Sequence, residues 1–255
     1  MNQKTVTLNT GAKMPVIGLG TYLCEPMPGK VTAAVKKAIT VGYRHIDAAL
    51  YYLNEDEVGK GIQEGLKETG IKREDIFVTT KLWNHHHRPE CVAGALEQSL
   101  KKLYKAGKAK AIGVSNFTID LIEDLLKKAE IKPAVNQVED NPYLPQHKLV
   151  KYCQDNGIQV TAYCPLGRAS TPSLHDDPVI KEIAKKNNMT TAQVILSWNA
   201  QRNVIVIPKS VTPSRIEENF KIAELPQEDF DKIQAITFRH RTHNPFNLFP
   251  DNGDF

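Results

Sequence analysis

The 255-residue sequence has few cysteines, no long apolar run and no strong excess of charge. Cys24, Cys91, Cys153 and Cys164 are widely separated and form no CxxC pair, so we expect reduced thiols and a cytoplasmic location rather than a disulfide framework. No apolar stretch approaches membrane-spanning length, and the first residues lack the apolar core of a signal peptide. The net charge of +4 does not indicate nucleic acid as a partner, although a small anionic ligand would suit it.

The apolar pattern predicts an α/β protein. Residues 5–8 and 13–15 flank an Asn/Gly turn and predict a β-hairpin. About seven short buried strands then alternate with amphipathic helices, which is typical of a parallel sheet. Expected helices include about 54–69, 89–104, 146–156, 179–187, 191–200 and 227–236. Polar residues follow the strands and no GxGxxG is present, so we predict a TIM-type (β/α) barrel, one domain over 1–255, rather than a Rossmann fold.

Three polar residues at the ends of two neighbouring strands predict a proton-transfer site. Asp47 ends the strand 45–47, Tyr52 follows five residues later, and Lys81 ends the strand 76–81. An ammonium about 4 Å from a phenol is worth roughly 4 kcal/mol at an effective dielectric near 20, which would lower a tyrosine pKa by up to about 3 units before desolvation. The alternative is an interior Asp–Lys pair with a tyrosine packed nearby.

The segment VIVIPKSVTPSRIEEN, residues 204–219, predicts an anion site. A strand is followed by Lys209 and Ser210, and a helix capped by Thr212 then begins with Arg215 in its first turn. Backbone N–H groups at a helix start attract phosphate, and two cations strengthen that attraction. The alternative is an ordinary strand-to-helix connection with exposed charges.

Six segments in this order make the sequence resemble the aldo-keto reductase family, in particular its aldose and aldehyde reductases. They are GYRHIDAALYYLNEDEVG, FVTTKLW, KAKAIGVSNF, AVNQVEDNPYLPQ, VTAYCPLG and IPKSVTPSRIEEN. The resemblance implies that NADPH reduces a small carbonyl substrate, that Tyr52 donates the proton, and that Asp47 and Lys81 lower its pKa. It also implies a monomer without metal, nucleic acid or membrane.

The resemblance also implies the binding residues. Cofactor residues are Thr21, Ser115, Asn116, Gln137, Tyr163, Lys209, Ser210, Thr212, Arg215, Glu218 and Asn219. Lys209 and Arg215 would contact the 2′-phosphate, which favours NADPH over NADH. Substrate-pocket residues are Tyr22, Trp83, Phe246 and Leu248, and the tail 238–255 corresponds to the loop that shapes substrate choice.

One departure separates this sequence from that family. The family has a further βα unit whose strand ends in a catalytic His, but here SLKKL, ending at Leu103, continues directly into YKAGKAKAIGVSNF. We therefore expect a barrel lacking one βα unit after about Leu103. His85, His86 and His87 are weak candidates to replace the missing His. Three outcomes stay open: a reductase with weak or lost activity, an NADPH-binding protein without turnover, and a poorly folded variant.

Overall fold

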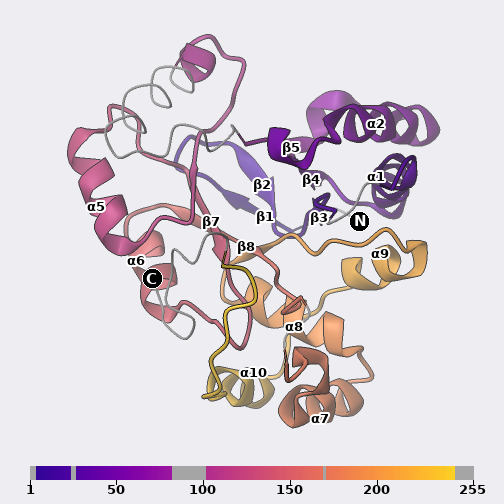
Figure 1. Cartoon of the computed structure of the whole chain (residues 1–255), viewed down its shortest axis with the longest axis vertical. Helices are drawn as coiled ribbons and strands as arrows, with labels where there is room; N and C mark the ends of the chain where they lie inside the picture. The colour runs from indigo at the N-terminus through magenta and orange to yellow at the C-terminus, as the bar shows by residue number, and fades with distance from the viewer. Residues whose placement is uncertain (1–3, 24–26, 82–101, 169–170, 245–255) are drawn as a thin grey trace.

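The computed structural model describes residues 4–23, 27–81, 102–168 and 171–244 (Figure 1). The predicted hairpin is present: β1 (Thr5–Thr7) pairs antiparallel with β2 (Lys13–Pro15). Its apolar side chains pack against Phe77 and Ile205, each the first residue of a strand in the main sheet. The hairpin therefore covers the amino-terminal ends of these strands and leaves the carboxyl ends to the functional side chains.

Seven parallel strands follow among the described residues. They are β3 (Leu19–Gly20), β4 (His45–Asp47), β5 (Phe77–Thr79), β6 (Val114–Ser115), β7 (Val135–Glu139), β8 (Gln159–Tyr163) and β9 (Ile205–Val206). One ladder runs β3-β4-β5 and another runs β6-β7-β8-β9. Parallel bridges from Ile17 to Val206 and from Gly20 to Lys209 join β9 to β3. Hydrogen bonds thus connect the strands from β6 through β9 and β3 to β5.

The β5–β6 side differs from the rest of the sheet. Within the described ranges, no hydrogen-bonded ladder joins β5 to β6. Both strands are partly exposed along their whole length, whereas β3, β4 and β9 are fully buried. The two strands expected to be neighbours if a βα unit is missing are therefore not directly paired in the described part of the chain.

The helices lie around the strands, with α1, α2 and α9 on one side and α5 and α6 on the opposite side (Figure 1). Their bounds are α1 (Lys30–Val41), α2 (Glu55–Thr69), α5 (Ile119–Lys128), α6 (His147–Asp155), α7 (Pro178–Lys186), α8 (Thr191–Gln201), α9 (Pro213–Phe220) and α10 (Gln227–Gln234). The expected helices agree with these bounds within about two residues, except that most of 89–104 lies outside the described residues.

Close packing of α1 on α2 fixes the helix that follows Tyr52. A Cβ at Gly61 would lie 2.7 Å from the Thr32 carbonyl oxygen, and one at Gly65 would lie 2.9 Å from the Cβ of Ile39. Only glycine permits so short a separation at these two positions. These contacts fix the position of α2, the helix that follows Tyr52, against α1.

Candidate active site

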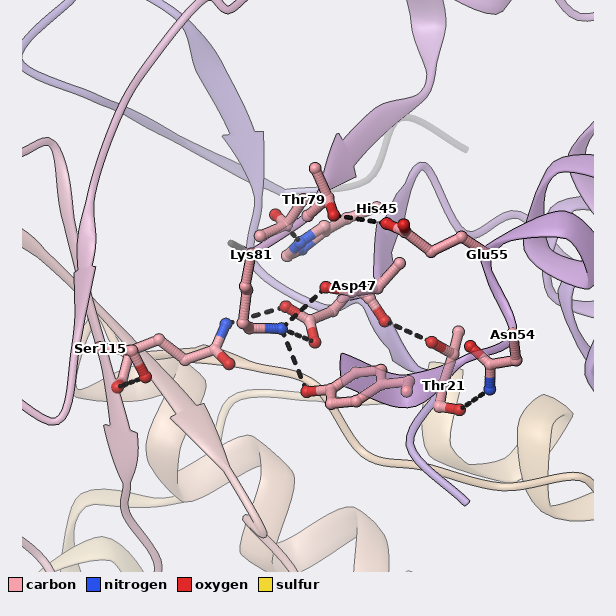
Figure 2. Close-up of polar contacts among 12 residues, drawn as sticks. Thr21, His45, Asp47, Asn54, Glu55, Thr79, Lys81 and Ser115 are labelled. Carbon is pink, nitrogen blue, oxygen red and sulfur yellow. Dashed lines mark hydrogen bonds and ion pairs between the residues drawn. The ribbon is translucent and has the colours of Figure 1, made fainter. Parts of the chain in front are cut away.

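Asp47, Tyr52 and Lys81 meet at the carboxyl ends of β4 and β5, as the sequence predicts (Figure 2). The Lys81 ammonium donates to Asp47 Oδ2 at 2.6 Å, to the Ala48 carbonyl at 3.0 Å and to the Tyr52 hydroxyl at 3.2 Å. The side chain of Asp47 is 2% exposed and that of Lys81 is 22% exposed. A buried carboxylate therefore holds an ammonium against a phenol at this edge of the sheet.

The acidity of Tyr52 differs from the expectation. Burial raises the pKa of Tyr52 above its ordinary value, and the nearby Asp47 carboxylate acts in the same direction. The expectation that Asp47 and Lys81 lower this pKa is therefore wrong, because desolvation of the phenolate and the Asp47 charge both raise it. Tyr52 is accordingly a neutral phenol that can donate a hydrogen bond or a proton.

Thr21 and Asn54 brace the loop around this trio. The Thr21 backbone N–H and hydroxyl both donate to the Asp47 carbonyl, at 3.2 and 2.9 Å, and the Asn54 side chain donates to the Thr21 carbonyl at 3.0 Å. All three residues are buried. Thr21 therefore contacts the backbone at the end of β4, and these bonds fix the position of the Asp47 backbone from which its side chain extends.

The residues expected to hold the nicotinamide also lie together. Gln137 on β7 donates from Nε2 to Asp47 Oδ1 at 2.8 Å, which links the second ladder directly to the trio. Ser115 Oγ donates to the Gln137 carbonyl at 2.8 Å, and the Tyr163 hydroxyl donates to Asn116 Oδ1 at 2.9 Å. Asn116 has a φ of +60°, which turns the chain after β6 and aims its amide toward Tyr163. Four strands and loops distant in sequence thus converge on one polar patch.

The expected adenosine end lies at the start of α9. Pro213 occupies the first helical turn, and Thr212 is at the N-cap position without capping the helix; instead its N–H donates to Ser210 Oγ at 3.1 Å. Lys209 and Arg215 are exposed on either side of this turn. A small pocket is lined by Gly20, Thr21, Lys209, Ser210 and residues of α1. Uncapped N–H groups beside two cations suit a phosphate.

The remaining α9 residues differ in exposure. Asn219 is buried and Glu218 is half-buried, and the Glu218 carbonyl accepts from Gln193 on α8 at 3.1 Å. The Asn219 side chain is therefore less accessible than the exposed cations at the start of the helix.

Of the expected pocket residues, only Tyr22 is in the described part of the chain. Its ring centroid lies 5.1 Å from that of Tyr52. Trp83, Phe246, Leu248 and the 85–87 His run lie outside the described residues. Among the described residues, no group of three His, Cys, Asp or Glu side chains could hold a metal ion, and no helix is long and apolar enough to cross a membrane.

Several site residues have no clear signal in the sequence. The Ala48 carbonyl accepts from Lys81 through its backbone, so residue type says nothing about it. In the sequence Asn54 is recognisable only as the start of a helix, although its side-chain amide donates to the Thr21 carbonyl. Glu139 is a buried carboxylate at the end of β7, and its partners lie about a hundred residues later, which no local pattern reveals.

Comparison with known proteins identifies the family. The family model described as aldo/keto reductase matches residues 16–106 and 98–237, which together cover most of the chain. This chain belongs to the aldo/keto reductase family. A glycerol 2-dehydrogenase (NADP(+)) of Hypocrea jecorina is 40% identical over 294 aligned residues, covering 92% of each chain. The uncharacterized oxidoreductase YtbE of Bacillus subtilis is 42% identical over 283 aligned residues, covering 99% of this chain and 98% of the relative.

Solved structures of the family share the fold. The aldose reductase of Schistosoma japonicum superposes with a TM-score of 0.84 at 37% identity, over 95% of both chains. An aldo-keto reductase solved in complex with NADPH superposes with a TM-score of 0.87 at 34% identity, over 100% of this chain and 94% of the other. The architecture is thus the α/β barrel of this family, with its N-terminal hairpin.

Proposed function

We propose that this protein reduces small aldehydes or ketones to alcohols with NADPH, and that Tyr52 donates the proton. The observation that carries the proposal is the contact of the Lys81 ammonium with both Asp47 and the Tyr52 hydroxyl, at 2.6 and 3.2 Å. The names of the relatives agree with it, since the glycerol 2-dehydrogenases of Hypocrea jecorina and Saccharomyces cerevisiae use NADP(+).

The residues of the trio have separate tasks in this proposal. When bound, NADPH supplies a hydride to the carbonyl carbon. The carbonyl oxygen then gains negative charge, and the neutral Tyr52 hydroxyl donates its proton to that oxygen. Lys81 stabilises the phenolate that remains, because its ammonium is 3.2 Å from the oxygen. Asp47, almost wholly buried, holds that ammonium in place through the 2.6 Å ion pair.

The donor set of the chain fits NADPH. Lys209 and Arg215 beside the uncapped start of α9 would hold the 2′-phosphate, with Ser210, Thr212, Glu218 and Asn219 around the adenosine. Ser115, Asn116, Gln137 and Tyr163 would hold the nicotinamide, and Thr21 lies between the two ends in the same pocket as Lys209. Gln137 would have to exchange its bond to Asp47 for one to the carboxamide.

We also propose that the chain lacks the βα unit that carries the family's catalytic His. The alignments to the two relatives run over 294 and 283 residues, 39 and 28 more than this chain contains. The two segments matched by the family model meet at residues 98–106, around Leu103. Loss of one donor to the developing oxyanion lowers rates by about 10²–10³-fold, so we expect slow turnover.

The test is consumption of NADPH at 340 nm with a reactive aromatic aldehyde. Tyr52→Phe should lower the rate by about 10²–10⁴-fold, the usual contribution of a positioned general acid. Tyr51→Phe is the matched control, because the neighbouring Tyr51 is 56% exposed, and it should keep the rate of the unmodified protein. Equal rates for the unmodified protein and Tyr52→Phe would contradict the proposed role.

A second candidate function is NADPH binding without turnover. It is favoured by the raised pKa of Tyr52, which makes the phenol a weaker acid than the sequence predicts. Quenching of protein fluorescence by NADPH in a protein with no measurable rate would select this function.

A further inference from the structure

Glu139, at the end of β7, is a buried carboxylate that the proposed reaction does not use. It accepts three hydrogen bonds from residues about a hundred positions later: from the Thr242 N–H at 2.7 Å, the Thr242 hydroxyl at 2.5 Å and the His243 N–H at 2.9 Å. The residue is 0% exposed. These contacts attach the segment after α10 to the carboxyl end of the sheet, where the polar patch of the candidate site lies.

Burying a carboxylate in order to attach a segment carries a desolvation cost. Burial raises the pKa of Glu139, while the Thr242 and His243 donors and the nearby Arg241 oppose that rise. Replacing Glu139 alone by an apolar residue would leave the Thr242 and His243 donors without their acceptor, which costs more than the hydrogen bonds contribute. Glu139 therefore gives this segment a fixed position and register, which apolar packing alone would not specify.

His243, in the segment that Glu139 holds, contacts Tyr163, one of the residues expected to hold the nicotinamide. The His243 ring lies edge-on to the Tyr163 ring, with centroids 5.7 Å apart and planes at 88°. Arg168 Nη1 lies 3.0 Å from His243 Nδ1. A guanidinium only donates, so Nδ1 is the acceptor and the imidazole is neutral with its proton on Nε2. Tyr163 is held on its other side by the bond from its hydroxyl to Asn116 Oδ1.

We propose that Glu139 is a positioning residue: by holding Thr242 and His243, it braces the Tyr163 ring on which the nicotinamide stacks. This inference rests on the proposed function for the role of Tyr163. In this inference the Glu139 carboxylate fixes the Thr242–His243 backbone, and this backbone fixes the His243 ring. The His243 ring in turn supports the Tyr163 ring. Glu139 itself contacts neither cofactor nor substrate.

The test uses the full chain with 3-fluorotyrosine at position 163, read by fluorine NMR, together with NADPH affinity from fluorescence quenching. Thr242→Val and Glu139→Gln should shift or broaden the fluorine resonance, and Thr242→Val decides the route through His243, because Glu139 is also the cross-strand partner of Tyr163 and its charge acts on that phenol directly. Each should also raise the Kd for NADPH about fivefold, the equivalent of one net hydrogen bond. Thr242→Ser keeps the hydroxyl and should restore both values to those of the unmodified protein.

Asp229→Asn is the control for general destabilisation. Asp229 is also 0% exposed but bonds Lys186 and Asn187 on α7, so its loss should lower Tm and leave the resonance unchanged. An unchanged resonance in Thr242→Val and Glu139→Gln would overturn the inference, and so would a shifted resonance with unchanged NADPH affinity. If the unmodified protein bound no NADPH, the proposed function would fail, whereas the resonance would still decide whether Glu139 acts on Tyr163.

Discussion

The two sides of the barrel differ in how they hold the site. On one side β9 joins β3 through parallel bridges between buried strands, and Lys209 lies at the end of this junction. On the other side β5 and β6 are partly exposed, and no ladder joins them in the described ranges. Lys81 lies two residues after β5, and Ser115 is the last residue of β6. Lys209, an expected cofactor residue, thus lies on continuous sheet, and Lys81, the lysine of the proposed trio, lies at the less connected side.

Under the proposal that a βα unit is missing, this difference explains how the contacts among Asp47, Tyr52 and Lys81 can persist. The trio does not depend on pairing between β5 and β6, because Lys81 is held by Asp47 and the Ala48 carbonyl from β4 and its loop. Gln137 then connects Asp47 to β7 across the barrel interior. This side-chain bond links the two ladders across the interior, in addition to the backbone bridges between β9 and β3.

The largest expected effect is a loss of activity caused by a substitution on the β5 side. Lys81→Met removes the ammonium next to the Tyr52 hydroxyl and should lower kcat by about 10²–10⁴-fold, with little change in NADPH affinity. Lys72→Met is the matched control, since Lys72 precedes β5 and its side chain is 79% exposed. A loss of NADPH affinity as large as the loss of kcat would show that Lys81 is needed for the cofactor end instead.

The complementary change is on the β9 side. Lys209→Ala combined with Arg215→Ala should raise the Kd for NADPH by about 10²–10⁴-fold, because the two charged hydrogen bonds contribute about 1.5–3 kcal/mol each. The Kd for NADH should change little, since NADH lacks the 2′-phosphate. Lys221→Ala, an exposed lysine just after α9, serves as the control. Equal weakening of both cofactors would contradict the assignment of these cations to the 2′-phosphate.

The buried His45 side chain on β4 predicts that the free energy of unfolding depends on pH. Burial lowers the pKa of His45 from 6.5 to about 4, while its Nε2 lies 3.1 Å from Thr79 Oγ1. The unfolded chain binds this proton near pH 6.5 and the folded chain does not, so stability falls as pH decreases from 6.5 towards 4. At pH 5 the loss is about 2 kcal/mol.

Urea unfolding at pH 7 and pH 5 measures this effect. His45→Gln cannot titrate in this range and should lose less stability between the two pH values than the unmodified protein. The groups that face His45 are Asp47, which raises its pKa, and Lys81, which lowers it. An identical pH dependence of stability in both proteins would mean that His45 is more accessible to water than its burial indicates.

The smallest effect compares backbone protection on the two sides. Amides of β5 should exchange with solvent about tenfold faster than those of β9, because partly exposed strands open locally at lower free energy. Hydrogen exchange followed by mass spectrometry over residues 77–79 and 205–206 measures this ratio. Equal protection would show that the β5 side is as well covered in solution as the β9 side.

Much of the fold follows from local pattern. The hairpin and the parallel strands appear where alternation and turn residues place them, and Pro213 begins α9 as its sequence signal predicts. The strands 76–81 and 111–115 are shorter than expected, at Phe77–Thr79 and Val114–Ser115. Their apolar sequences favour long strands, but ladder length depends on a neighbour, and neither strand pairs with the other in the described part of the chain.

The grouping of Asp47, Tyr52 and Lys81 was predictable from the sequence, but the direction of the Tyr52 pKa shift was not. Strand ends brought Asp47 and Lys81 together, yet the direction of the Tyr52 pKa depends on how deeply the phenol is buried, which spacing does not reveal. The bond from Gln137 to Asp47 depends on barrel closure. The attachment of Thr242 to Glu139 joins residues that are 103 positions apart, beyond the reach of any sequence motif.

The most direct test of the central claim is deuterium transfer from NADPH labelled with deuterium at both C4 positions to an aromatic aldehyde. The account predicts an alcohol carrying one deuterium on its carbinol carbon, formed slowly by the unmodified protein and not above background by Tyr52→Phe. Absence of label above the Tyr52→Phe background, in a protein that still binds NADPH, would contradict the claim that the trio of Asp47, Tyr52 and Lys81 remains catalytic.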